Sequence, residues 1–363
     1  MKIKVYSEFN DRLENIWKKF EKDATMTPFQ SWVWLSNWYK TVGHPLLSVT
    51  PQVVHIYNHE ETIAIIPFSI RKKFGAKLLE WMGGINTDYM GPLLHSEFEN
   101  KDGINDLWSK IRNKLNKYDA LHLQKQVEST KTFLYQIGFE DKINQYLKAY
   151  KVALPDDWET YYNGLKKGLR SDSRRQMRRI KELGTLDIVI QNDLKVKNEI
   201  IKTMITQKRR RYQETGVSDF LSLGEYRNFY KGLASIPQGE LNIHCSSLIL
   251  DGARVATHVG FVDKTTFFYL MPTYEGGEWE KYSPGRLLLI ELFKWAINNN
   301  FKFFDFTIGG EVYKKDWCNI ETCLYESKKV ATLIGIFYIF IISLKSILLN
   351  TKFFSKTIKF IRK

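Results

Sequence analysis

Cysteine is scarce in this sequence. The 363 residues hold three cysteines, Cys245, Cys318 and Cys323. No two of them form a CxxC pair, and no Cys/His cluster has the spacing of a zinc site. The sequence therefore excludes a disulfide-stapled secreted domain and a structural zinc module. We expect reduced thiols, a reducing compartment and no metal.

A long apolar run is missing from the start of the chain. Residues 1–20 contain lysines, acids and scattered apolar residues, with no apolar core of the kind that a secretory signal requires. The pattern predicts a cytoplasmic protein.

Acidic residues are missing from the end of the chain. Residues 328–363 contain eight Lys or Arg and no Asp or Glu, in a protein whose net charge is +14. More than half of the excess positive charge thus lies on one short segment. A uniformly basic nucleic-acid-binding protein is excluded, and we expect no nucleic-acid partner.

The same segment predicts a membrane-associating tail at residues 329–363. Residues 330–344 are uncharged and apolar-rich, but a spanning helix needs about 20 such residues. Beyond them, lysines recur at helical spacing opposite apolar residues, a pattern typical of helices that lie on an anionic membrane surface. We expect peripheral attachment to the inner leaflet of the plasma membrane. A helix packed on the body and a true span are the alternatives. The lysines are Lys345, Lys352, Lys356, Lys359 and Lys363.

The rest of the chain predicts two related domains, 1–150 and 151–328. Residues 241–274 contain three alternating strand patterns, with a hairpin turn at Asp251-Gly252. A helix and a strand follow them. The same β-β-β-α-β order recurs less clearly over residues 50–124. We therefore expect an α+β fold with two mixed β-sheets flanked by helices.

Helices are predicted at several other places. A helix over residues 28–42 would place Trp34 on an apolar face, and residues 100–117 predict another. Residues 155–184 predict two helices, the second capped by Ser171 or Ser173 and ended by Gly184.

The segment from Tyr282 to Lys315 predicts a phosphate site. It consists of a YSPGR turn, an amphipathic helix, an FFDF strand and IGGEVYKKDW. A proline suits the first turn of a helix, a glycine permits close approach, and free N–H groups at a helix start bind phosphate. A well-capped surface helix is the alternative. The residues of the predicted site are Ser283, Pro284, Gly285, Arg286 and Leu287.

Three segments resemble the GNAT-type acyltransferases of the CelD/BcsL group, which are related to Fem peptidoglycan transferases. They are PFQSWVWLSNW at 28–38, LRSDSRRQMRRIKELG at 169–184, and YSPGRLLL with FFDFTIGGEVYKKDW within 282–317. The resemblance implies a tandem GNAT fold and an acyl-CoA donor, most simply acetyl-CoA, with its pyrophosphate on residues 283–287. It implies direct transfer from the thioester to an amine or a hydroxyl, without a covalent enzyme intermediate.

Direct transfer requires a base for the nucleophile and a donor for the oxyanion. His258 is the candidate base, because it lies on a predicted strand beside the small residues Ala256 and Gly260. His244 is a weaker candidate on the neighbouring strand. Asp305 would orient a partner or the substrate. For each residue the alternative is a buried, hydrogen-bonded structural side chain.

The candidate acceptor-binding residues form three groups. The arginines of the basic helix would bind phosphates of a sugar or lipid-linked acceptor. Two residues near the end of the motif would touch substrate or cofactor. A Gly-rich loop and a tryptophan would line a cleft in the first domain. Solvated surface charge and core packing are the alternatives. The residues are Arg174, Arg175, Arg178, Arg179, Tyr313, Lys314, Trp34, Asp88 and Tyr89.

Three functions follow from these patterns. The first is an acyl-CoA-dependent N- or O-acyltransferase that acts on a cell-envelope or polysaccharide precursor. The second is a Fem-like transferase that uses aminoacyl-tRNA, against which the lack of a long heptad repeat counts. The third is a non-catalytic, membrane-bound scaffold with the GNAT fold.

Overall fold

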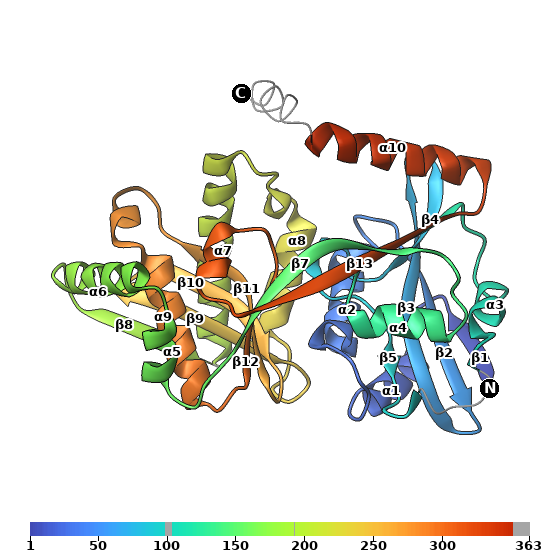
Figure 1. Ribbon diagram of the computed structural model, residues 1–363, viewed down its shortest axis with the longest axis horizontal. Helices are drawn as coiled ribbons and strands as arrows, with labels where there is room; N and C mark the ends of the chain where they lie inside the picture. Colours follow the sequence, from blue (N-terminus) through green and yellow to red (C-terminus); the bar gives the residue numbers. More distant parts are fainter. Residues whose placement is uncertain (99–103, 192, 351–363) are drawn as a thin grey trace. The chain divides into compact units, whose positions relative to one another are not determined.

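The computed structural model describes residues 1–98, 104–191 and 193–350. They form two compact units (Figure 1). Unit 1 consists of residues 1–147 together with the segment that begins at residue 323, and unit 2 consists of residues 148–322. Each unit contains one mixed β-sheet with helices packed on it, so the expected α+β fold is confirmed.

The sheet of unit 1 has the order β1-β2-β3-β4-β6-β13. Its neighbouring strands are antiparallel, except that β4 and β6 are parallel. A tight turn between residues 58 and 61 joins β2 to β3. The strands are β1 Lys2–Tyr6, β2 Thr50–Asn58, β3 Glu61–Lys73, β4 Ala76–Trp81, β6 Ala120–Gln126 and β13 Ile320–Val330, and the short β5 Leu93–Leu94 pairs with β3.

The sheet of unit 2 repeats this pattern in the order β8-β9-β10-β11-β12-β7. Here too a single neighbouring pair is parallel, β11 with β12. The expected hairpin at Asp251-Gly252 joins β9 to β10. The strands are β8 Leu186–Gln191, β9 Asn242–Leu250, β10 Ala253–Val262, β11 Thr266–Tyr274, β12 Phe303–Ile308 and β7 Ile143–Ala153.

The last strand of each sheet comes from the other half of the chain. Strand β7 follows the first-half segments, yet its residues 149–153 pair with β12 in unit 2. Strand β13 follows the second-half segments, yet its residues 325–330 pair with β6 in unit 1. The expected domain limits after residues 150 and 328 therefore lie inside β7 and β13.

The helices of unit 1 are shorter than the apolar patterns predict. Residues 28–42 do not form one helix, because Ser31 leaves the helical region and caps α2 by accepting a hydrogen bond from the backbone N–H of Trp34. A 3₁₀ turn, Pro28–Gln30, precedes α2, and a π turn, Tyr39–Gly43, follows it. The helices are α1 Asp11–Phe20, α2 Trp32–Trp38, α3 Leu107–Arg112, α4 Glu128–Gln136 and α10 Leu333–Asn350.

The helices of unit 2 cover both faces of its sheet. On β10, Thr257 donates its hydroxyl to Gln207 of α7, whereas Ala256 packs with apolar residues of α9. The expected caps of α6 are wrong. The helix begins at Lys167, so Ser171 and Ser173 lie inside it, and it ends at Lys181. The helices are α5 Trp158–Gly164, α6 Lys167–Lys181, α7 Leu194–Thr215, α8 Gly224–Ala234 and α9 Pro284–Asn298.

Helix α10 packs on β4 and β6 of unit 1 with one narrow stripe. Tyr338 is buried and forms a 2.9 Å hydrogen bond with Nδ1 of His122. At Gly335 a Cβ would lie 1.9 Å from the carbonyl oxygen of Asp119, so only glycine permits this approach. The opposite stripe exposes large apolar side chains to solvent: Leu333, Ile334, Ile336, Phe337, Phe340 and Leu344.

The predicted lysine stripe lies outside the described side chains, which end at Leu344. Within the part of the chain that the structure describes, no helix has both the length and the apolar character needed to cross a bilayer. The same residues contain no group of His, Cys, Asp and Glu placed to hold a metal ion.

Candidate functional site

Strands β11 and β12 separate partway along their length. Their parallel register runs only from Thr266 opposite Phe303 to Phe268 opposite Asp305. Strand β11 continues to Tyr274, and β12 continues to Ile308 through an irregularity at which Thr307 has φ +55°. The carboxyl ends of the two parallel strands thus form a split in the sheet of unit 2.

A lysine from a neighbouring segment bonds to each strand of the split. Lys208 of α7 donates from Nζ to the carbonyl oxygen of Pro272 on β11, at 3.2 Å. Lys314 donates from Nζ to the carbonyl oxygens of Phe306 and Ile308 on β12, at 3.0 and 2.7 Å. Glu311 lies 3.1 Å from the Lys314 ammonium. The split therefore carries two amino groups and one carboxylate.

The environment of Lys208 favours a neutral amine. Burial lowers the pKa of Lys208 to about 8, Glu311 opposes this effect, and the cations Lys314 and Arg211 add to it. Burial also raises the pKa of the nearby Cys318 thiol to about 12. A lysine with a pKa near 8 can accept a proton near neutral pH, whereas Cys318 remains a thiol and is a poor nucleophile.

The predicted phosphate turn connects β11 to α9. Ser283 has φ +52°, and α9 begins at Pro284 as expected. The amides of Arg286 and Leu287 bond back to the Ser283 carbonyl, at 3.0 and 3.2 Å. The Gly285 N–H lies in the first turn, where a helix offers no i−4 acceptor. A Cβ at Gly285 would lie 2.9 Å from the Tyr274 ring, so this glycine permits the close packing of the turn on β11.

Two of the four α6 arginines predicted to bind the acceptor lie beside this turn. Arg175 and Arg286 both pair with the carboxylate of Asp172, so the charge of Arg286 is already shared. Arg179 lies over the ring of Tyr282, 5.3 Å from its centroid. The other two, Arg174 and Arg178, line a different cavity of unit 2.

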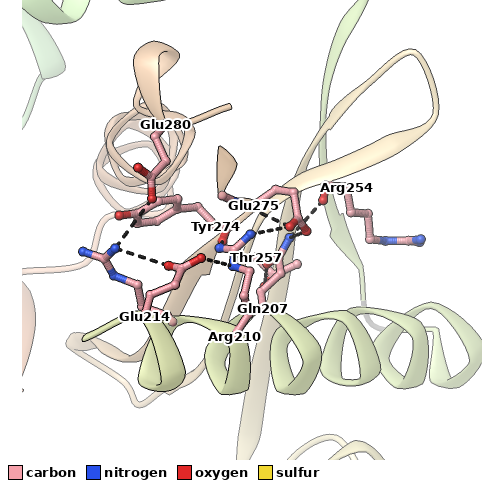
Figure 2. Close-up of polar contacts among 10 residues, drawn as sticks. Gln207, Arg210, Glu214, Arg254, Thr257, Tyr274, Glu275 and Glu280 are labelled. Atoms are coloured by element: carbon pink, nitrogen blue, oxygen red, sulfur yellow. Dashed lines mark hydrogen bonds and ion pairs between the residues drawn. The ribbon is translucent and has the colours of Figure 1, made fainter. Parts of the chain in front are cut away.

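A polar network attaches the loop after β11 to α7, as Figure 2 shows. Arg210 bonds to Glu275 and to the carbonyl oxygen of Tyr274. Gln207 accepts from the Thr257 hydroxyl at 2.9 Å and donates to the Arg254 carbonyl oxygen at 3.0 Å. The network holds the entrance to α9 in a fixed place relative to α7, the helix that carries Lys208.

The two predicted catalytic side chains lie in the core of unit 2. His258 is 0% exposed and stacks on Tyr269, with ring centroids 4.7 Å apart. Burial, and after it His244, hold the pKa of His258 well below its usual value. Asp305 is buried and accepts a 2.7 Å hydrogen bond from the Thr307 N–H, which supports the irregularity in β12. Asp305 matches the alternative of a buried, hydrogen-bonded side chain, whereas His258 is buried but neither of its ring nitrogens has a hydrogen-bond partner among the described residues.

The predicted residues of unit 1 lie together, but mostly in the core. Trp34 is buried and donates its indole N–H to the Thr87 hydroxyl at 2.9 Å, and Tyr89 is buried near it. Asp88 lies 3.9 Å from the ammonium of Lys125, which donates to the Thr87 carbonyl oxygen at 2.6 Å. Burial lowers the pKa of Lys125. The core alternative thus describes Trp34 and Tyr89, whereas Asp88 belongs to a charged pair.

Sequence reasoning missed two lysines in these places. Lys208 stands in a KRRR run, which indicates only a basic surface, and Lys125 lies near the end of an ordinary strand. Lys208 lies four residues before Tyr212 and next to the buried Gln207, so a helical projection would have placed it at the edge of the packed face. No local pattern would have indicated the role of Lys125.

Comparisons with known proteins agree with this geometry. Residues 167–315 match the family model of the acetyltransferase (GNAT) domain, whereas no curated protein matches. The fold is similar to a crystal structure of FemX, with a TM-score of 0.62 at 13% identity, over 90% of this chain and 97% of that one. It is also similar to L-PGS from Bacillus licheniformis, with a TM-score of 0.58 at 12% identity, over 93% and 98%.

A third similar structure is the C-terminal domain of a putative lysylphosphatidylglycerol synthetase from Agrobacterium fabrum. Its TM-score is 0.55 at 12% identity, over 90% of this chain and 96% of that one. At these identities the likeness establishes a common fold. The repeated sheet pattern and the matched domain together confirm the tandem GNAT arrangement expected from the sequence.

Proposed function

We propose that this chain, whose residues 167–315 match a GNAT acyltransferase domain, transfers an acyl group from acyl-CoA to an amine or hydroxyl of a cell-envelope precursor. One observation carries the proposal. The parallel strands β11 and β12 separate beside the start of α9, which places an opening in the sheet next to free helix N–H groups.

The donor would bind along this opening. Its pyrophosphate would lie on residues 283–287, where the Gly285 N–H and the positive end of the α9 dipole attract an anion. Its thioester would enter the split between β11 and β12. Acetyl-CoA is the donor to test first.

Lys208 is the group that we assign as general base. A neutral Lys208 amine would take a proton from the acceptor nucleophile as that atom attacks the thioester carbonyl carbon. The oxyanion that forms would be stabilised by the Lys314 ammonium. Collapse of the tetrahedral intermediate breaks the carbon–sulfur bond, and the CoA thiolate leaves. Asp305 would keep the shape of β12 beside this centre, and Tyr313, whose ring packs on Phe306, would contact the substrate.

The acceptor class rests on indirect support. FemX, L-PGS and the putative lysylphosphatidylglycerol synthetase have a similar fold. The last of these names describes an enzyme that makes a phospholipid. Asp88 of unit 1 is a candidate contact for an acceptor amine, while Trp34 and Tyr89 would support the loop that holds it. An acceptor of sugar or lipid type agrees with a protein located at a membrane.

Membrane association is the second part of the proposal. The solvent-facing stripe of α10 would enter the headgroup region, and the basic segment that follows would contact anionic lipids. The enzyme would then work in the cytoplasm at the inner face of the plasma membrane, where acyl-CoA is available.

A Fem-like transferase that uses aminoacyl-tRNA is the alternative function. The similarity to the fold of FemX favours it, and the cations of α6 would then contact RNA phosphates. A non-catalytic scaffold is the remaining hypothesis, and a loss of turnover in a folded Lys208 variant would argue against it.

The test is a calorimetric titration of the full chain with acetyl-CoA and with longer acyl-CoAs. The full chain is used because a chain shortened at the expected domain limit, residue 328, would lack part of β13. Micromolar binding that Gly285→Asp abolishes is the expected result. Gly168→Asp is the matched control, since it adds the same charge where a Cβ meets no atom within 4 Å. A folded chain that binds no acyl-CoA would contradict the proposal and would favour aminoacyl-tRNA.

A further inference from the structure

A cavity of unit 2, separate from the strand split, lies between α5, α6 and α9 and has a volume of about 600 Å³. Its lining includes none of the residues Ser283–Leu287 and no part of the strand split. Arg174 and Arg178, the two predicted arginines that lie away from the donor turn, line this cavity. The proposed transfer reaction leaves this cavity without a role.

Aromatic rings hold two cations in the wall of this cavity. Trp158 stacks on Tyr162, with centroids 4.9 Å apart and planes 27° apart. The Arg174 guanidinium lies 5.3 Å from the Tyr162 centroid, and the Lys294 ammonium lies 5.6 Å from that of Trp158. Cation–π contacts therefore orient these two charges before any ligand arrives.

The charge of the cavity is unbalanced. Four cationic side chains and two carboxylates line it. Lys294 pairs with Glu291 at 2.8 Å, whereas Arg174, Arg178 and Lys181 form no ion pair within the described ranges of the chain. They recur at positions i, i+4 and i+7 of α6, so they share one helix face. Such an unneutralised face favours an anion.

A buried hydroxyl group also faces this lining. Ser173 is 2% exposed, it lines the cavity, and its Oγ has no hydrogen-bond partner among the residues that the structure describes. A buried hydroxyl without a partner is costly, so native structures usually give it one. An oxygen atom of a ligand in the cavity would accept a hydrogen bond from the Ser173 hydroxyl.

We propose that this cavity binds a phosphate monoester. The phosphate would lie between the guanidinium groups of Arg174 and Arg178, with Ser173 donating to one of its oxygens. The organic group would pack on Met177 and Ile290, the apolar part of the lining. A soluble metabolite and a phosphatidic-acid headgroup both present this chemistry.

The test compares three probes on the full chain: inorganic phosphate, phenyl phosphate, and phosphatidylcholine vesicles with and without phosphatidic acid. We expect phenyl phosphate to bind more tightly than inorganic phosphate. Arg174→Gln/Arg178→Gln should weaken it by about tenfold or more, and Ser173→Ala by a few fold. The control is Lys110→Gln/Lys114→Gln, which removes two exposed charges at the same spacing in unit 1. Unfolding temperatures would show that each variant folds.

The outcomes separate this site from the donor site. Binding of either ester that the arginine variant weakens and Gly285→Asp leaves unchanged supports the cavity, and the probe that responds identifies the soluble or the lipid source. Equal binding by the parent protein and the arginine variant would overturn the proposal, as would loss of binding in Gly285→Asp. Titration of acetyl-CoA reports on the transfer reaction independently.

Discussion

The two lysines at the strand split have different surroundings. Lys314 donates to two main-chain carbonyls and pairs with Glu311, which fixes an ammonium group at the end of β12. Lys208 donates to one carbonyl oxygen of the split, that of Pro272, and two other cations lie near it. At the scale of residues, the first suits the stabilisation of an oxyanion and the second suits proton transfer.

The low pKa of Lys208 predicts the pH dependence of transfer. Since the neutral amine is the active form, kcat/KM should rise with pH up to about 8, the pKa of Lys208, and then level off. Lys208→Met should lower kcat/KM by about 10²- to 10⁴-fold and abolish this rise. Steady-state rates between pH 6 and pH 9.5 measure both.

The control for this prediction is Lys202→Met on the exposed side of α7. It should leave the pH profile unchanged. A folded Lys208→Met variant that keeps the profile of the parent protein would show that another group accepts the proton.

Residue roles were the least predictable level of this protein. The start of α9 at Pro284 and the close approach at Gly285 agree with the sequence, because both depend on local backbone geometry. The choice of His258 rests on residue type and a strand pattern, and a strand pattern does not show which sheet face a neighbouring helix covers. A role for Lys208 could not be predicted, because its low pKa follows first from burial in the folded protein and then from charges that include the distant Glu311 and Lys314.

At the scale of elements, α10 approaches the sheet of unit 1 closely at Gly335. Gly335→Ala would place a Cβ 1.9 Å from the Asp119 carbonyl oxygen and force α10 away from the sheet of unit 1. Overpacking of this kind costs about 1–3 kcal/mol. We expect a lower free energy of unfolding in denaturant titrations.

Gly168→Ala is the control for the α10 variant, since it lies in a helix where a Cβ meets open space. It should be neutral or stabilise the protein by about 0.5–1 kcal/mol. Equal effects of the two substitutions would mean that α10 is free to shift.

The exposed stripe of α10 predicts the response of the protein to membranes. Phe337→Asp and Phe340→Asp should each reduce co-sedimentation with vesicles that contain phosphatidylglycerol, because a carboxylate disfavours insertion and repels anionic lipid. Val217→Asp, on an exposed apolar residue of unit 2, is the control. Unchanged sedimentation of the phenylalanine variants would mean that the basic segment, and not the exposed stripe of α10, binds the vesicles.

Strands and hairpins were more predictable than helix limits. Strand patterns indicated β2, β3 and β9 to β11, although consecutive residues of β2, β3 and β9 are buried and both faces of these strands are therefore covered. The limits of α2 and α6 were wrong, since Ser31 breaks a continuous apolar pattern and the serines of α6 lie inside the helix. Backbone capping depends on dihedral angles that residue types only suggest.

At the scale of the whole molecule, the exchange of final strands could not be predicted. Neither β7 nor β13 is among the strands expected from the sequence, and a strand pattern would not have identified the pairing partner of either. The exchange ties the stability of unit 1 to the end of the chain. A chain ended after Thr322 should lose the β13 pairing with β6 and expose that strand edge.

Calorimetry tests this dependence. The shortened chain should show a separate transition at lower temperature that the full chain lacks, because the sheet of unit 1 is incomplete. An unchanged melting profile would show that β6 and its neighbours are stable without β13.

The exchange also sets an order of events during synthesis. A ribosome delivers the strands of unit 1 up to β6 early, but it delivers β13 only after all of unit 2 has been made. The edge of β6 must therefore wait while residues 127–319 are translated. During that interval the nascent chain carries an unfinished sheet, and we expect it to be the stage at which chaperones or aggregation compete with folding.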